Sequence, residues 1–124
     1  MRGLLDTHIL LWWLTEPRRL SAAQYGAITN ERHDLAVSAV SIAEIAIKTS
    51  IGKLPVIDGL TELVARQGFR ELQFANRHAL QLATLPLLHR DPFDRMLVAQ
   101  CIADDLILIT GDGQLSEYPI ETIK

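Results

Sequence analysis

The sequence has no long hydrophobic run, and its 124 residues include a single cysteine. No apolar stretch approaches the roughly 18 residues that a membrane-crossing helix needs. The first residues, MRGLLDTH, lack the basic region, long apolar stretch and cleavage site of a secretory signal. We therefore expect a cytoplasmic protein without membrane contact.

The lone cysteine, Cys101, excludes an internal disulfide bond. It lies inside the apolar stretch MLVAQCIA, where a small buried thiol is the ordinary outcome. A catalytic thiolate needs an electropositive, partly exposed setting and a histidine partner, and this stretch supplies neither. Cysteine-based catalysis is therefore not expected.

An excess of basic charge is also missing, since the formal net charge is −3. Proteins that coat nucleic acid nonspecifically depend on Lys and Arg to neutralise phosphates, so this balance argues against that class. It does not exclude an enzyme that acts on nucleic acid. Acids committed to a metal ion would leave the remaining chain more basic, and the ion would add positive charge where a phosphate sits.

What the sequence does contain is a regular alternation of strand and helix patterns, with 48% hydrophobic residues to fill one core. The predicted strands cover 2–5, 34–40, 69–74, 106–110 and a short segment in the tail, and the predicted helices cover 8–17, 22–33, 42–53, 61–67, 77–85 and 92–104. This alternation predicts one domain over 1–124 with an α/β fold. We expect a three-layer α/β/α sandwich around a mostly parallel sheet.

Four acids fall near the carboxyl ends of the predicted strands, where ligands bind in such folds. Asp6 directly follows the first strand, and Glu44 lies a few residues beyond the second. Asp94 lies in the first turn of the helix that leads into strand 106–110, and Asp112 lies just past that strand.

Each acid also has a structural explanation. Ser41 to Glu44 has the capping-box pattern, so Ser41 is predicted to cap its helix, as Ser21 and Asn76 are predicted to cap theirs. Asp91 can cap the helix that begins at Pro92, with the next acid favoured by the helix dipole. Asp6 can cap the helix of HILLWW, and Asp112, which lies between two glycines, suits a turn.

Together the four acids indicate a metal site. Carboxylates directed toward one edge of a sheet repel one another and raise each other's pKa values unless a cation lies between them. Oxygen ligands without thiolates or paired histidines suit Mg²⁺ or Mn²⁺. Such an ion lowers the pKa of a bound water and stabilises charge on an attacked phosphate.

Four segments, in this order and spacing, resemble the PIN-domain family, specifically the VapC-type toxins of bacterial toxin–antitoxin pairs. They are LLDTHILLWWL, SAVSIAEIAIK, HRDPFDRMLVAQ and LITGDGQL, and the resemblance runs the length of the chain. It implies a Rossmann-like α/β/α sandwich, Mg²⁺- or Mn²⁺-dependent endoribonuclease activity and inhibition by a cognate antitoxin. The family's four metal-site acids correspond to Asp6, Glu44, Asp94 and Asp112.

On this basis the acids receive roles in hydrolysis of an RNA phosphodiester by a Mg²⁺-activated water. Asp6 and Asp94 are assigned as the main metal ligands. Glu44 is a ligand or orients the water, and Asp112 is an outer ligand or a ligand of a second ion. The number of ions stays open.

Five further residues have supporting roles. Thr110 is predicted to hold a carboxylate or the attacking water, with an ordinary strand threonine as the alternative, and Thr7 is similar. Lys48 lies one turn after the helical glutamate and either pairs with it or contacts a phosphate. Arg90 and Arg95 flank the aspartates of HRDPFDR and are further candidate RNA contacts.

The helix of HILLWWL is apolar nearly all round, and Trp12 and Trp13 point about 100° apart. A small domain is not expected to bury both indoles, so the helix is predicted to form a homodimer seam or the groove for an antitoxin segment. The alternative is burial under segment 54–68.

Two other functions compete with the ribonuclease. A phosphoryl-acceptor receiver domain also places acids at this sheet edge, but it needs an acidic doublet after its first strand, and Asp6 stands alone there. A PIN-like module that binds without cutting is the other alternative, and the presence of all four acids argues against it.

Overall fold

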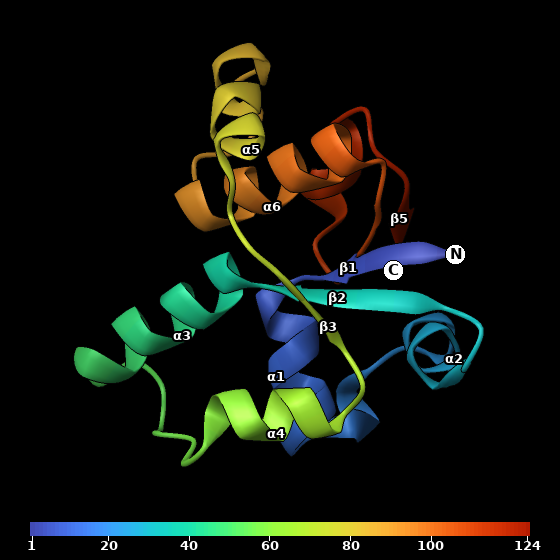
Figure 1. Cartoon of the computed structure of the whole chain (residues 1–124), viewed down its shortest axis with the longest axis vertical. Coiled ribbons are helices and arrows are strands. Elements are labelled where there is room, and N and C mark those ends of the chain that lie inside the picture. Colours follow the sequence, from blue (N-terminus) through green and yellow to red (C-terminus); the bar gives the residue numbers. More distant parts are fainter.

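One parallel sheet forms the centre of the molecule (Figure 1). The structure is a computed structural model that describes all of residues 1–124. The strands are β1 (Arg2–Leu5), β2 (Asp34–Ser38), β3 (Arg70–Leu72), β4 (Ile107–Ile109) and β5 (Thr122–Ile123). They lie in the order β3-β2-β1-β4-β5, and every neighbouring pair is parallel. The predicted α/β fold is therefore confirmed.

Helices cover both faces of this sheet. They are α1 (Thr7–Thr15), α2 (Ala22–Thr29), α3 (Ala39–Ser50), α4 (Leu60–Arg66), α5 (Asn76–Gln81) and α6 (Pro92–Asp104), with short 3-10 turns η1 (Pro17–Arg19), η2 (Leu82–Thr84) and η3 (Gly113–Glu117). In Figure 1, α1, α2 and α4 lie on one side of the sheet, α5 and α6 on the other, and α3 extends from the end of β2. None of the helices has the length and apolar character needed to span a bilayer.

Alternation along the central strands divides the core into two layers, because successive strand residues face opposite sides. Leu4 and Leu108 belong to the cluster that packs under α6, and their neighbours Leu5 and Ile109 belong to the cluster that packs under α1. All four side chains are fully buried. Burial on both faces explains why these strands are continuous apolar runs in the sequence.

Two predicted helix starts were wrong. Helix α3 begins at Ala39, and the hydroxyl of Ser38 caps it by accepting from the Val40 amide at 3.0 Å. The predicted capping box of Ser41 and Glu44 does not exist, since both residues lie inside the helix. β-branched residues and the run SAVS favoured a longer strand, but Ser38 is already a good cap and ends β2.

The start of α5 differs in a similar way. Asn76 is its first helical residue rather than its cap. The Ala75 amide instead donates to Nδ1 of His78 at 2.9 Å. The predicted caps Ser21, Asp6 and Asp91 are confirmed, and Ser21 forms a full capping box with Gln24.

The strand order places a topological switch point between β1 and β4. From β1 the chain proceeds to β2 and β3 on one side, and it later returns to β4 on the other side. In open parallel sheets the connections diverge at such a point, and the carboxyl ends of the strands form a site for ligands. Leu5 pairs with Ile109, so the residues that follow them, Asp6 and Thr110, lie side by side at this point.

Candidate metal centre

Asp6 follows β1 and is held by two hydrogen bonds. Its Oδ1 accepts from the Ile9 amide at 3.1 Å, which caps α1, and its Oδ2 accepts from the Thr110 hydroxyl at 2.5 Å. The residue is only 4% exposed. Burial raises the pKa of Asp6 above its ordinary value, although the Thr110 hydrogen bond opposes the rise. A bound cation would offset the cost of keeping this carboxylate ionised.

Glu44 lies in the middle of α3 and points into the molecule. Its Oε2 accepts from Lys48 Nζ at 2.6 Å, and this bond raises the pKa of the lysine. Its Oε1 is buried and has no hydrogen-bond partner in the protein. An unpartnered buried carboxylate oxygen is costly, so Oε1 needs a partner that the chain does not supply. Glu44 caps no helix, and its ion pair with Lys48 accounts for Oε2 but not for Oε1.

Asp94 lies in the first turn of α6. Both its own amide and that of Phe93 donate to Oδ1 of Asp91, at 3.2 and 2.8 Å, so Asp91 sets the start of the helix. Burial raises the pKa of Asp94 to about 7, and the negative charges of Asp91 and Asp6 contribute to the rise. Asp94 is therefore placed where negative charge accumulates without a cation.

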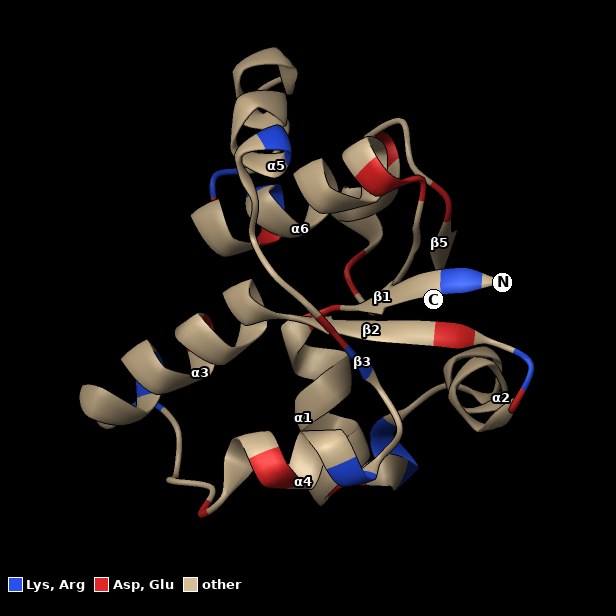
Figure 2. Ribbon diagram, in the orientation of Figure 1, with Lys and Arg blue, Asp and Glu red and all other residues tan.

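Asp112 is held at the end of β4 by Thr110. The Thr110 hydroxyl accepts from the Asp112 amide at 3.0 Å while it donates to Asp6. Oδ1 of Asp112 accepts from the Gln114 amide at 2.9 Å and so caps η3. Figure 2 shows acidic positions (red) at the end of β1, the start of α6 and the loop after β4, all near the centre of the view.

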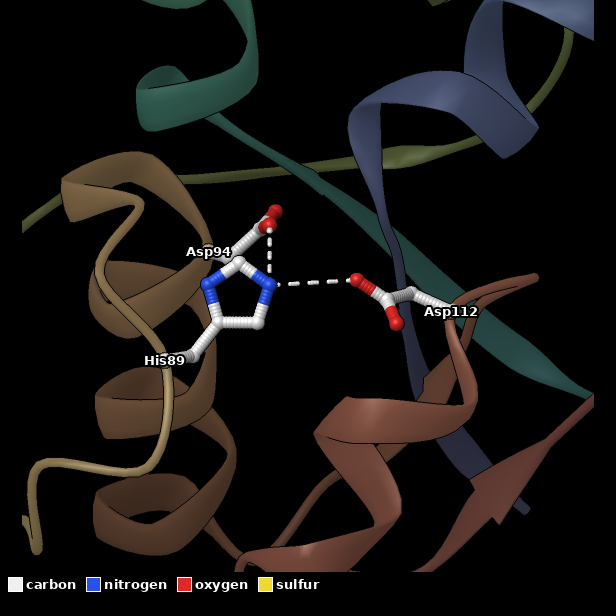
Figure 3. Close-up of side chains that lie close together, drawn as sticks. All are labelled: His89, Asp94 and Asp112. Atoms are coloured by element: carbon white, nitrogen blue, oxygen red, sulfur yellow. Dashed lines mark hydrogen bonds and ion pairs between the residues drawn. The ribbon is translucent and has the colours of Figure 1, made fainter.

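His89, which the sequence reasoning missed, lies between two of the acids (Figure 3). Its Nε2 is 3.2 Å from Oδ2 of Asp112 and 3.6 Å from Oδ2 of Asp94. One ligand atom from each of the three residues lies within 4.8 Å of the others, whereas Asp6 and Glu44 are outside this close group. The segment HRDPFDR carries the signal, because the histidine precedes both aspartates there.

The donor set fits a hard divalent cation. Carboxylate oxygens predominate, Glu44 Oε1 lacks a partner, and the pKa values of Asp6 and Asp94 are raised by burial. Cations such as Mg²⁺ and Mn²⁺ bind oxygen donors of this kind. The only cysteine, Cys101, is buried in α6, and burial raises the pKa of its thiol, so it does not offer a thiolate.

The remaining predicted residues have different surroundings. Thr7 donates to the Ser41 hydroxyl at 2.9 Å and thereby joins α1 to α3. Arg95 donates to the Pro86 carbonyl at 2.9 Å and to Tyr118 Oη at 3.2 Å, so it fixes the loop before α6. Arg90 is exposed. Of the three predicted RNA contacts, Lys48 is thus paired with an acid and Arg95 is engaged by the loop.

A cavity of about 270 Å³ extends along α1, and Glu44 is the one member of the four acids that lines it. Glu44 and Lys48 line it near the site, and Trp12 and Arg19 line it farther along. The Arg19 guanidinium lies 4.7 Å from the centroid of the Trp12 ring. Trp13 points elsewhere and donates to Oε1 of Gln67 at 3.1 Å, so it contacts segment 54–68 but stays partly exposed rather than buried beneath it.

Comparisons with known proteins agree with this geometry. A profile of the PIN domain matches residues 3–121. Ribonuclease VapC22 of Mycobacterium tuberculosis is 34% identical over 122 residues, which cover 93% of this chain and 90% of the relative.

Solved structures show the same fold. VapBC2 from Rickettsia felis, bound to a DNA fragment from its promoter, superposes with a TM-score of 0.69 at 14% identity and covers 98% of this chain and 97% of that one. FitAcB from Neisseria gonorrhoeae gives 0.68 at 17% identity, with 100% and 97% covered, and a toxin–antitoxin complex from Klebsiella pneumoniae gives 0.68 at 16%, with 98% and 96% covered. From the profile match and the identity to its VapC relative, the chain belongs to the PIN-domain family and to its VapC branch.

Proposed function

We propose that this protein is a Mg²⁺- or Mn²⁺-dependent endoribonuclease that serves as the toxin of a toxin–antitoxin pair. Its VapC relative is named a ribonuclease. The observation that carries the proposal is the unpartnered, buried Oε1 of Glu44 beside two carboxylates with raised pKa values. Buried carboxylate oxygens seldom lack a partner in native proteins, so this oxygen favours a ligand that the chain does not supply.

Each acid contributes differently. Asp6 and Asp94 would hold the ion, Glu44 would offer Oε1 to it or to the attacking water, and Asp112 would complete the site from the loop after β4. When bound, the ion activates water and stabilises charge on the phosphate. The chain itself places the acids: Thr110 aims Asp6 and Asp112, and the Asp91 cap sets the position of Asp94. The proposal covers either ion, Mg²⁺ or Mn²⁺, and either one or two bound ions.

The partners follow from the relatives. A structure with the same fold is a toxin–antitoxin complex, and we propose an antitoxin as the inhibitor of this chain as well. Residence in the cytoplasm and assembly as a homodimer stay predictions. The receiver-like alternative does not fit a PIN profile that spans residues 3–121.

The decisive experiment compares Asp94, in the first turn of α6, with Asp105, which caps the other end of the same helix. Purified protein is incubated with RNA in Mg²⁺ or Mn²⁺, alongside the Asp94→Asn and Asp105→Asn variants. Asp105 is an exposed acid at the far end of α6 with φ of 54°, a conformation that Asn tolerates. We expect Asp94→Asn to lose cleavage and Asp105→Asn to keep it.

Undiminished cleavage by the Asp94→Asn variant would contradict the site assignment. Absence of cleavage in the unaltered protein, with RNA binding intact, would favour the non-cleaving PIN-like module instead. Far-ultraviolet circular dichroism of each variant checks that the fold is retained. Mapping the cut positions in total RNA would then identify the substrate.

A further inference from the structure

His89 is fixed in the loop before α6 by contacts on both its main chain and its ring. Its amide donates to Tyr118 Oη at 3.1 Å, and its ring Nδ1 lies 3.1 Å from the Asp91 amide nitrogen. The side chain is only 15% exposed. The imidazole is therefore held in one orientation, with Nε2 toward the two acids (Figure 3).

The contact with Asp91 determines which ring nitrogen carries the hydrogen. Because Nδ1 accepts from the Asp91 N–H, a neutral imidazole must carry its hydrogen on Nε2. Nε2 then donates to Oδ2 of Asp112, with Oδ2 of Asp94 nearby. In this arrangement His89 has no lone pair to offer to a cation between the two carboxylates.

Coordination through Nε2 would require the other tautomer. Its hydrogen would then lie on Nδ1 and face the Asp91 N–H, so that two donors would oppose each other. Coordination through Nε2 would therefore cost the ring its contact with the Asp91 amide. The Nε2–H of His89 thus occupies Oδ2 of Asp112, an oxygen that a cation bound between the two carboxylates would need.

Both acids are positioned without help from His89. Asp112 is held by the Thr110 hydroxyl and the Gln114 amide, and Asp94 is placed by the start of α6. Loss of the imidazole would therefore leave the carboxylates in place while removing the hydrogen bond that a cation must replace.

Resting on the proposed function, we propose that His89 is a placeholder for the divalent cation: in the metal-free protein it donates to Asp112 beside Asp94, and it is displaced, rather than used as a ligand, when the ion binds. Its role is to give Oδ2 of Asp112 a hydrogen-bond donor while the site lacks an ion. The cost is weaker metal binding, because the hydrogen bond to Asp112 must be broken first.

The test is the affinity of the protein for Mn²⁺, measured by electron paramagnetic resonance or calorimetry without RNA. The informative variant is His89→Asn, because an Asn side chain can accept from the amide two residues later and so replace Nδ1 toward Asp91. It is too short to replace Nε2. His33→Asn is the matched control, since His33 bonds to the Ala27 carbonyl, outside the proposed site.

A placeholder predicts that His89→Asn binds Mn²⁺ more tightly, by roughly three- to tenfold, because one hydrogen bond no longer competes. A ligand predicts weaker binding, and a bystander predicts no change; either result would overturn the proposal. Failure of the unaltered protein to bind Mn²⁺ at all would instead count against the proposed function.

A second measurement needs no variant and keeps the test valid if His89→Asn fails to fold. In ¹⁵N-labelled protein, Mg²⁺ should shift the His89 ring nitrogens and the Asp91 amide away from their metal-free positions as this contact breaks. Ring signals that do not move at saturating Mg²⁺, or loss of the hydrogen from Nε2 as coordination through that nitrogen requires, would overturn the placeholder role.

Discussion

The hydroxyl of Thr110 donates to Oδ2 of Asp6 at 2.5 Å and joins the ends of two adjacent strands that are 104 residues apart in sequence. Both residues are almost fully buried. The same hydroxyl accepts from the Asp112 amide, so one atom relates two of the four acids. Of the two roles predicted for Thr110, the structure shows that it holds a carboxylate.

Replacing Thr110 by Val should destabilise the protein and disturb the site together. The substitution leaves Oδ2 of Asp6 and the Asp112 N–H without this partner, which should lower the free energy of unfolding by about 1–3 kcal/mol. Mn²⁺ affinity should fall as well, because both acids lose their alignment. Urea denaturation and Mn²⁺ titration measure the two effects. Thr110→Ser retains the hydroxyl and should restore both, so a Ser variant as weak as Val would contradict this role.

The raised pKa of Asp94 predicts a pH-dependent gain in stability from Asp94→Asn. The folded-state value of about 7 lies above the ordinary value of 3.8, so the folded protein binds this proton more tightly than the unfolded chain. The resulting penalty is absent below the ordinary value and complete above pH 7. In EDTA at pH 8, the Asn variant should therefore be more stable by on the order of 1–3 kcal/mol.

The same comparison near pH 4 should show almost no difference, because Asp94 is protonated in the folded wild-type protein there. Urea denaturation at the two pH values gives the result directly. A stability difference that does not change with pH would mean that burial and neighbouring charge do not raise the pKa of Asp94.

Asp91 should affect the site through the helix start and through its charge, and two substitutions separate these effects. Asp91→Ala removes the cap of α6 and should cost about 1 kcal/mol of stability. Asp91→Asn keeps a capping side chain but removes the charge, and it should lower the pKa of Asp94. Carbon-13 spectra of the Asp94 carboxyl and Mn²⁺ titration provide the measurements.

Metal affinity should decrease moderately in Asp91→Ala and be largely lost in Asp94→Asn, because only the second carboxylate is assigned to the ion. An equal loss in the two variants would contradict this division between a cap and a ligand. An unchanged pKa of Asp94 in the Asp91→Asn variant would show that the charge of Asp91 does not raise it.

The cavity along α1 predicts a difference between two neighbouring arginines. Arg19 lines it and stacks on Trp12, whereas Arg18, in the same short turn, does not line it. Guanidinium and indole planes stack on bases, so Arg19→Gln should weaken binding of single-stranded RNA by roughly three- to tenfold. Arg18→Gln should have a small effect. Fluorescence anisotropy in the Asp94→Asn background measures binding without cleavage.

Equal effects of the two arginine substitutions would show that only general charge matters. Loss of antitoxin binding in Arg19→Gln, with RNA binding unchanged, would assign the cavity to the protein partner. Either result would contradict the prediction that RNA binds in this cavity while leaving the four acids unaffected.

The sequence alone determined the layers of the fold and the identity of the acids. Continuous apolar strands between helical segments require burial on both faces. Asp6 follows its strand directly and Asp112 follows within a few residues, so their place at one sheet edge could be read from local pattern. The cap at Asp91 was equally local, since a helix start depends on a few adjacent residues.

Other properties were decided only by the tertiary structure. Ser41 and Glu44 match a capping box, but the end of β2 at Ser38 moved the helix start and turned Glu44 into a buried side chain with an unpartnered oxygen. No local pattern shows that Nε2 of His89 meets Asp112, because this contact requires the loop before α6 to pack against the end of β4. Capping is decided by neighbours in sequence, whereas desolvation and contacts between separate elements are decided by packing.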